Sequence, residues 1–509
     1  MSNAKRLLKN SLFLYARMLI VMGIGFFTTR KILEALGVVD LGISNVVCSI
    51  TGMFDFISSS LTNSTQRFLN VGLGKNDPKL TNQYFSQSLL LQVALTFVLA
   101  IIVYPVGMWL IHNKMVIPIE RLDAAIWVFR FSVISLVIRL TRISFESSVI
   151  ARERMSFYAY LSIIEGVGKL LICYLIIYNN SFDKLIYYGF CLLALNFSIT
   201  LFNAGYCMLN FPESRFRFYA DKGVFKQLTS FIGLNSVGVI SYAFAKNGVD
   251  ILINMFFGPA LNAAKGLATQ LDRLVSQFGT NIDLAIRPQI TKMAAGQEYD
   301  EMVKLAMKGS RYIFFVMLFV AMPFLFETES VLKIWLGNVP DYTETFVRIL
   351  VFNLLFTTIN TPFNDVSMAI GKIKNIQVYG RLFFTVSILP IGYLILHFWK
   401  SPNLLLAVEA FLALLYTLFI AWEDNRYLHF GMVRYIKKVI EPAGLMLGIL
   451  VMIGLSVSII PVLGNVYVDF FVKSVLLWFL SFGIIWLFGV EKEDRCVVVD
   501  YIRNKFFRK

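Results

Sequence analysis

Apolar residues run along the chain in blocks of about 20, and short polar turns separate the blocks. A helix rises 1.5 Å per residue, so a block of this length crosses the roughly 30 Å of hydrocarbon in a bilayer. The pattern therefore predicts an all-α polytopic membrane protein. About fourteen transmembrane helices are expected, near residues 11–33, 42–66, 84–111, 122–148, 157–178, 185–210, 227–256, 260–286, 308–326, 345–369, 376–398, 403–424, 439–460 and 466–489.

The composition agrees with this pattern. Of the 509 residues, 57% are hydrophobic and 16% are charged, whereas a soluble domain carries roughly a quarter charged residues. The five cysteines show no CxxC spacing and the three histidines lie far apart in sequence. Neither a disulfide framework nor a metal site is therefore expected, and no cofactor is predicted.

The basic residues fall mainly on one side of the predicted membrane. The turns on the side of the N-terminus hold 29 Lys and Arg residues, and the opposite turns hold 7. The positive-inside rule then places both termini in the cytoplasm. The net charge of +15 matches the anionic lipid headgroups on that side, so membrane lipids rather than nucleic acid are the expected partners.

Polar residues form a stripe along one face of the second predicted helix, because they recur in steps of 3 and 4. The stripe consists of Ser44, Cys48, Thr51, Asp55, Ser58 and Thr62. Adding 221 to each number gives a similar, mostly polar stripe in the eighth helix. That second stripe consists of Lys265, Thr269, Asp272, Ser276, Gly279 and Asp283.

A second stripe lies in "SVISLVIRLTRISFE", residues 132–146, where Ser132, Ser135, Arg139, Arg142 and Glu146 share a face. Adding 218 to the last four gives neutral polar residues only, Asn353, Thr357, Asn360 and Asn364. Both shifts span six helices, an even number, so the copies keep the same topology, as parallel transporter repeats do. Two six-helix bundles are predicted, over residues 1–222 and 223–432. Helices thirteen and fourteen and a basic tail occupy 433–509.

Eleven Lys and Arg residues lie within the predicted membrane helices, where a charge costs about 2.5–3.5 kcal/mol at the centre. Arg348, Arg381 and Lys473 lie near helix ends and are expected to extend to the headgroups. Glu165 and Lys169 are four residues apart, which predicts a structural ion pair.

Arg139 lies deeper and shares its face with two serines. Two interpretations stay open for it: a water-filled cavity or a buried structural pair. Arg142 and Glu146 are spaced to pair, and Lys246 and Asp250 are spaced to neutralise each other. The candidate substrate-binding residues are Arg139, Arg142, Lys246, Lys265, Asp272 and Asp55.

The sequence lacks the motifs of ATP hydrolysis and of serine hydrolases, and its turns on the outer side are shorter than a membrane-embedded polymerase or ligase would need. It holds no GxxxxGK[ST] stretch for binding ATP phosphates and no GxSxG turn for a nucleophilic serine. The remaining interpretation is a secondary transporter or flippase rather than an enzyme.

Two stretches resemble a known family: "STQRFLNVGLGKND" after the second helix and "ARERMSFYAYLSIIE" entering the fifth. With the fourteen segments and the repeat, they resemble the polysaccharide-exporter branch of the multidrug/oligosaccharidyl-lipid/polysaccharide flippase superfamily (MOP superfamily). More narrowly, they resemble the Wzx-type O-antigen flippases of bacteria. The resemblance covers about residues 1–430, and the last two helices only by count.

The resemblance implies a MATE-like fold that moves undecaprenyl-diphosphate-linked oligosaccharide, for O-antigen (lipopolysaccharide) or capsule, across the bacterial inner membrane by alternating access. Arginine suits a diphosphate because its guanidinium binds phosphate in a bidentate manner. A polysaccharide polymerase and chain-length proteins are candidate partners. H⁺ and Na⁺ are both candidate coupling ions.

Two alternatives stay open. Flippases of the peptidoglycan-precursor lipid also have fourteen helices and cavity arginines. MATE-type drug exporters share the fold, but they usually have twelve helices and acidic ion sites, which makes them the less favoured alternative.

Overall fold

The computed structural model describes residues 3–75, 77–152, 154–178, 181–219, 222–460 and 465–496. Within these ranges, the description leaves out the side chains of residues 3–19, 55–56, 59–60, 63, 222, 224, 226–239, 281, 284–285 and 466. Every element in the described part is helical. In chain order, the elements of the first half are α1 (Asn3–Gly52), α2 (Asp55–Gly74), α3 (Pro78–Asn113), η1 (Ile119–Arg121), α4 (Leu122–Ala151), α5 (Met155–Tyr178), α6 (Lys184–Asn210), η2 (Pro212–Ser214), α7 (Lys222–Phe257) and α8 (Pro259–Ala295).

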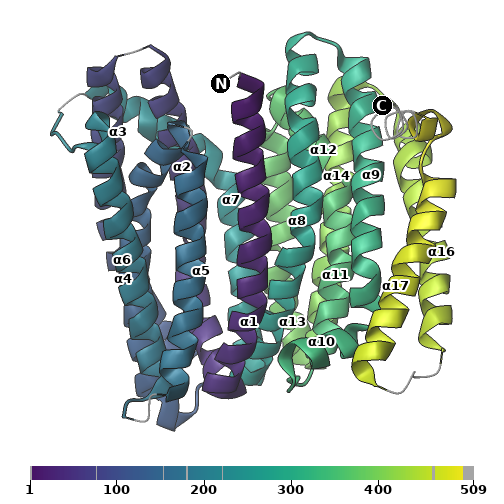
Figure 1. Ribbon diagram of the computed structural model, residues 1–509, viewed down its shortest axis with the longest axis horizontal. Helices are drawn as coiled ribbons and strands as arrows, with labels where there is room; N and C mark the ends of the chain where they lie inside the picture. The colour runs from purple at the N-terminus through teal and green to yellow at the C-terminus, as the bar shows by residue number, and fades with distance from the viewer. Residues whose placement is uncertain are drawn as a thin grey trace. The chain divides into compact units, whose positions relative to one another are not determined.

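The second half continues in the same way (Figure 1). Its elements are α9 (Tyr299–Phe326), α10 (Thr328–Leu336), α11 (Thr343–Ile359), α12 (Thr361–Ala369), η3 (Asn375–Val386), α13 (Ile388–Trp399), α14 (Pro402–Leu428), α15 (Met432–Tyr435), η4 (Ile436–Ile440), α16 (Glu441–Ser458), α17 (Val466–Ile484) and η5 (Ile485–Gly489).

The all-helical, multi-pass architecture predicted from the sequence is confirmed. Eleven helical spans among the described residues are long and apolar enough to cross a membrane. Three expected segments do not form separate spans in this set. Residues 42–66 fall in the end of α1 and in α2, residues 227–256 in α7, and residues 260–286 in α8. Polar stripes run along 42–66 and 260–286, whereas in 227–256 the side chains of residues 227–239 lie outside the described part of the chain.

The first two expected segments are arranged differently from the prediction. The helix α1 runs from Asn3 to Gly52 through the expected turn, with a kink at Gly37, where φ is +74°. Glycine adopts this left-handed conformation without steric cost. The second segment is instead interrupted at Met53 and Phe54, after which α2 begins at Asp55.

The described chain groups into two compact units. Unit 1 comprises Met1–Gly266 with Gly392–His397, and unit 2 comprises Leu267–Ile391 with Phe398–Lys509. The bundle boundaries at residues 222 and 432 stay a prediction.

The core of unit 1 lies where α1, α3 and α4 pack together. Its members include Val46 and Val47 of α1, Val103 of α3 and Phe129 of α4, all of them fully buried. Gly107 of α3 permits a close approach to α4, because a Cβ there would lie 2.0 Å from Cζ of Phe129.

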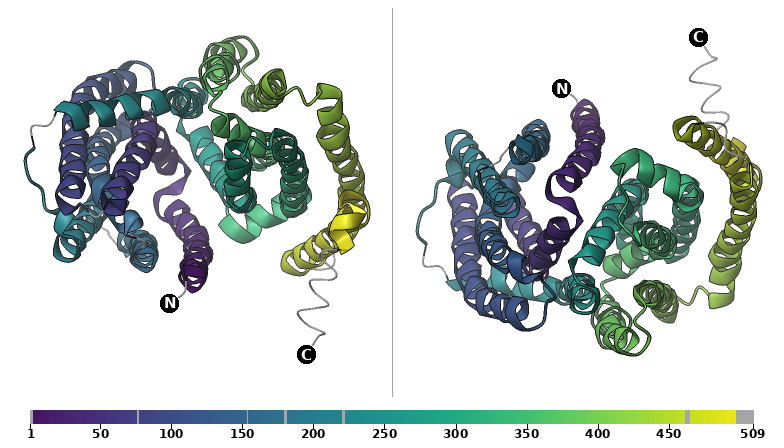
Figure 2. Two further views of the ribbon diagram at one scale, coloured as in Figure 1. Left: turned by 90° about the horizontal axis from the view of Figure 1, so that it is seen from above. Right: turned by 90° about the horizontal axis from the view of Figure 1, so that it is seen from below.

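The chain between α6 and α7 is fastened to unit 1. Residues 211–219, here called the strap, form a loop at the edge of unit 1 (Figure 2), and hydrogen bonds join it to the beginning of α3. Asn82 of α3 donates to the carbonyl oxygens of Glu213 and Arg215, at 2.8 and 2.7 Å, and accepts from the Tyr219 hydroxyl at 2.8 Å. Ser86 accepts from the backbone N–H of Arg217 at 3.1 Å.

In unit 2, α9 is the central helix. It packs against α11, α12, α16 and α17, and its fully buried residues include Phe314, Phe315, Met317 and Leu318. Residues 491–496, beyond η5, contact residues 308–312 of α9. Arg311 pairs with Glu491 at 2.8 Å, and both Lys308 and Tyr312 donate to the carboxylate of Asp494.

Candidate functional site

Five charged side chains meet between α4 and α5 of unit 1. We call this set, Arg139, Arg142, Glu146, Glu165 and Lys169, the α4–α5 charge cluster. Arg142 Nε lies 2.8 Å from Glu146 Oε1, one helical turn away, so the predicted pair is confirmed. Arg142 also extends to α5, where its Nη1 lies 3.8 Å from Glu165 Oε2.

The carboxylate of Glu165 is shared by three cations. Lys169 Nζ lies 2.8 Å from Glu165 Oε1, which confirms the second predicted pair. Arg139 is close enough to Glu165 to attract it electrostatically. The cluster therefore sums three positive and two negative charges.

The cluster is neither dry nor fully solvated. The side chain of Arg142 keeps 13% of its surface exposed and that of Glu165 keeps 26%. A group of charges within two membrane spans is costly unless the charges are paired or wetted, and here both conditions are met in part. The net positive charge of the cluster can attract an anion.

Lys265 has a partner on another helix. Its Nζ lies 2.8 Å from Asp250 Oδ1, and Lys265 is only 4% exposed. Ser49 of α1 donates to the second carboxylate oxygen of Asp250 at 2.9 Å. The pairing of Asp250 with Lys246, expected from their spacing, is thus replaced by a pairing with Lys265. The Nζ of Lys246 lies 5.8 Å from the centre of the Tyr242 ring.

The two acidic candidates are Asp272 and Asp55. Asp272 is half-buried on α8 and belongs to unit 2, whereas Lys265 belongs to unit 1. The side chain of Asp55 lies outside the described residues. Within the polar stripe of α1, Cys48 is exposed but Ser44 and Thr51 are buried.

Sequence reasoning missed a triad of charges in unit 2. Arg287 Nη2 lies 2.8 Å from Asp283 Oδ2, and its Nε lies 3.0 Å from Asp365 Oδ2. Both carboxylates are buried. Asp283 is the last residue of the polar stripe in α8, and Arg287 follows it by four residues. This spacing could have predicted the Asp283–Arg287 pair. Asp365 comes from α12, and its approach depends on the tertiary fold.

The prediction for Lys473 was wrong. Its side chain does not extend to the headgroups: it is 5% exposed and pairs with Asp469 of α17 at 3.0 Å. Arg348 pairs with Glu344 at 2.7 Å, and the Arg381 guanidinium lies 5.0 Å from the centre of the Tyr416 ring.

Comparison with known proteins gives the fold a context. No protein-family model and no curated protein matches the sequence. Among solved structures, the chain is similar to "Lipid II flippase MurJ, inward closed conformation", with a TM-score of 0.71 and 10% sequence identity. The match covers 94% of this chain and 99% of that one.

The chain is also similar to solved transporters of the MATE family. An inward-facing multidrug resistance MATE transporter of the MOP superfamily matches with a TM-score of 0.59 and 13% identity, over 82% of this chain and 94% of that one. A MOP superfamily transporter from Pyrococcus furiosus matches with a TM-score of 0.60 and 13% identity, over 83% and 96%. At such low identities these likenesses establish a shared fold.

Proposed function

We propose that this protein is a flippase for a lipid-linked oligosaccharide whose carrier bears a diphosphate. The observation that carries the proposal is the extent of the likeness to the lipid II flippase, which covers 94% of the chain, whereas the MATE transporters cover 82–83%. The longer match is expected for a flippase with two helices beyond the twelve-helix core.

The α4–α5 charge cluster supports an anionic substrate. Arg139 and Arg142 have guanidinium groups that bind phosphate oxygens through parallel hydrogen bonds. Glu146 and Glu165 hold the Arg142 guanidinium from two sides, which orients it before a ligand arrives. The lipid tail would stay in the bilayer while the diphosphate and the sugars pass along the charged face.

The remaining sequence candidates take different roles in this proposal. Lys246, Asp272 and Asp55 are further candidate contacts for the substrate. Lys265 either contributes a cation or acts only as the partner of Asp250. In this proposal both termini lie in the cytoplasm and the protein lies in the bacterial inner membrane, beside the enzymes that build and polymerise O-antigen or capsule.

The peptidoglycan-precursor lipid is the second candidate substrate. It is favoured by the same likeness, because the matched flippase is described as acting on lipid II. Both substrates share a polyprenyl diphosphate, so the charge cluster suits either. A MATE-type drug exporter is less favoured, because three of the five charges in the cluster are cationic.

Reconstitution into liposomes tests the proposal. The full chain is inserted into vesicles with a fluorescent polyprenyl-diphosphate oligosaccharide, and a membrane-impermeant reagent quenches the exposed label. A flippase raises the quenched fraction from about half to nearly all, since the inner pool becomes accessible. Parallel vesicles carry lipid II or a cationic dye. Transport of the dye alone would contradict the proposal, and transport of lipid II alone would assign the second substrate.

A further inference from the structure

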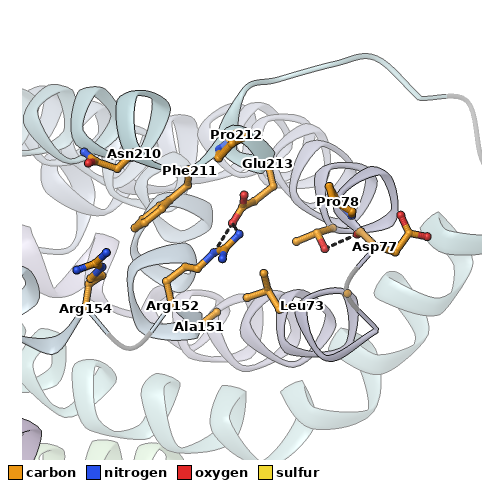
Figure 3. Close-up of a pocket in the computed structure, with 12 residues that line it drawn as sticks. Leu73, Asp77, Pro78, Ala151, Arg152, Arg154, Asn210, Phe211, Pro212 and Glu213 are labelled. Atoms are coloured by element: carbon orange, nitrogen blue, oxygen red, sulfur yellow. Dashed lines mark hydrogen bonds and ion pairs between the residues drawn. The ribbon is translucent and has the colours of Figure 1, made fainter. Parts of the chain in front are cut away.

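A polar pocket lies between three turns at one end of unit 1, and none of its lining residues belongs to the α4–α5 charge cluster (Figure 3). Its volume is about 740 Å³, which is within the usual range for a small-molecule site. Its walls come from the α2–α3 turn, the α4–α5 turn and the first residues of the strap.

The pocket lies at the ends of candidate membrane spans rather than along them. The lining residues Pro78, Ala151 and Asn210 are the terminal residues of three membrane spans. Phosphate groups of lipids occupy this depth of a bilayer, and arginine side chains there contact them.

Both carboxylates in the pocket wall are already engaged. Glu213 is 5% exposed, and its Oε1 accepts from Nε and Nη2 of Arg152 at 2.7 and 2.6 Å. Asp77 caps α3, because its Oδ1 accepts from the backbone N–H groups of Lys79 and Leu80, each at 3.0 Å. Their negative charge is therefore offset by an arginine and by the N-terminus of a helix.

The two arginines in the wall keep capacity for an anion. Glu213 engages only one edge of Arg152, whose side chain is 41% exposed. Arg154 is exposed, and among the described residues no carboxylate pairs with it. Figure 3 shows the Arg152 guanidinium near the middle of the pocket, directed at Glu213, and the Arg154 guanidinium beyond Phe211, with Asp77 at the opposite side.

The strap adds an independent observation. Beyond Glu213 it presents Arg215, Phe216, Arg217 and Phe218 to the surface, with Phe216 and Phe218 exposed by 48% and 74%. Hydrogen bonds to α3 hold the backbone of this segment in place. Alternating rings and guanidinium groups at the end of membrane spans suit the boundary between acyl chains and phosphates.

We propose that this pocket binds the phosphate group of a membrane amphiphile, with Arg152 and Arg154 contacting the phosphate oxygens and the exposed rings of the strap contacting its acyl chains. The inference does not depend on which molecule the protein transports. A soluble phosphate would contact the arginines in the same way, but it has no acyl chains to contact the rings. Binding of a phospholipid can therefore be distinguished from binding of free phosphate.

Calorimetric titration of the full chain in a neutral detergent tests the site. The ligands are dioctanoyl-phosphatidylglycerol, dioctanoylglycerol, which lacks the phosphate, and inorganic phosphate. We expect the phospholipid to bind and dioctanoylglycerol not to bind. Arg154→Ala should weaken phospholipid binding by roughly tenfold or more, the effect of losing a charge-assisted hydrogen bond. Because Arg154 is exposed, the variant should fold normally.

Matched variants keep the result unambiguous. Arg434→Ala removes an exposed arginine of unit 2 and should leave the affinity unchanged. Phe218→Ser should weaken phospholipid binding but not phosphate binding; inorganic phosphate that binds as tightly as the lipid would assign the site to soluble phosphate. Equal phospholipid affinity in the wild type and in Arg154→Ala would overturn the proposal, as would the absence of binding by both phosphate compounds.

Discussion

Glu165 and Arg142 join α5 to α4, with 3.8 Å between Oε2 of the carboxylate and Nη1 of the guanidinium. The other carboxylate oxygen of Glu165 pairs with Lys169. Without Glu165, the cluster would hold three cations against the single carboxylate of Glu146. The balance of charge between two membrane spans thus depends on one residue.

Glu165→Gln should therefore destabilise the protein. Losing one partner of a half-buried charge group is expected to cost about 1–3 kcal/mol. Lys169→Gln removes a more exposed member of the same pair and should cost at most about 0.5 kcal/mol. Thermal unfolding in detergent measures both, and equal midpoints for the two variants would contradict the central role of Glu165.

Arg139→Ala should abolish transport of the diphosphate-linked substrate while the protein stays inserted at normal abundance. If the guanidinium geometry matters, Arg139→Lys should fail nearly as completely, because an ammonium lacks the planar fork. The control is Arg130→Ala on the same helix, where the guanidinium lies 4.9 Å from the centre of the Trp127 ring. Loss of abundance together with transport would favour a purely structural pair with Glu165.

Lys265→Met separates the two roles open to Lys265. If it only pairs with Asp250, the variant strands a partly buried carboxylate at a cost of about 3 kcal/mol. The double variant with Asp250→Asn should then recover much of the stability, as measured by thermal unfolding. If Lys265 instead binds substrate, the single and double variants will both be abundant and both inactive in transport.

The contact between residues 491–496 and α9 should respond to acid. Burial alone would raise the pKa of Asp494, but hydrogen bonds from Lys308 and Tyr312 outweigh it and hold the pKa below its usual value of 3.8. The contact is therefore favoured above that usual pKa and is lost as the pH falls through the lowered one. A fluorophore on the exposed Cys496, in a Cys48→Ser/Cys191→Ser variant, should gain mobility only as the pH falls below 3.8, the usual pKa of the Asp494 carboxyl group.

Asp494→Asn is the control for this titration, since it removes the charge at every pH. Its fluorophore should be mobile throughout and should show no transition in the same range. A transition of equal size in the variant would assign the acid response to other carboxylates.

The orientation of the chain predicts opposite labelling of two lysine positions. Lys114 follows α3, and Lys372 follows α12; both are exposed, and each extends over an aromatic ring. In a variant without native cysteines, Lys114→Cys should react with an impermeant thiol reagent in intact cells, whereas Lys372→Cys should react only after lysis. The reverse pattern would show that the topology is inverted. A reporter that is active only in the periplasm, fused after Lys509, should be inactive if both termini are cytoplasmic.

The sequence predicted what depends on local spacing. The helical segments, the Arg142–Glu146 pair and the Glu165–Lys169 pair all follow from hydropathy or from positions four apart. The choice of Lys265 over Lys246 as the partner of Asp250 could not be predicted in this way, because it depends on how α7 and α8 pack.

The burial of Lys473 also could not be predicted from hydropathy. Lys473 lies near the end of a predicted helix, where a long side chain normally extends to water, yet tertiary packing encloses it with Asp469. The kink at Gly37 gave no local signal either, because glycine is common in membrane helices and its φ is set by the surrounding fold.

The hydrogen bonds between the strap and α3 bear on how the gene can be divided. If the halves are produced as two separate chains, a cut directly after Asn210 would remove residues that Asn82 and Ser86 hold in unit 1. A cut after Tyr219 would leave those partners on the same fragment. Two co-expressed polypeptides should therefore reassemble from the later cut and fail from the earlier one.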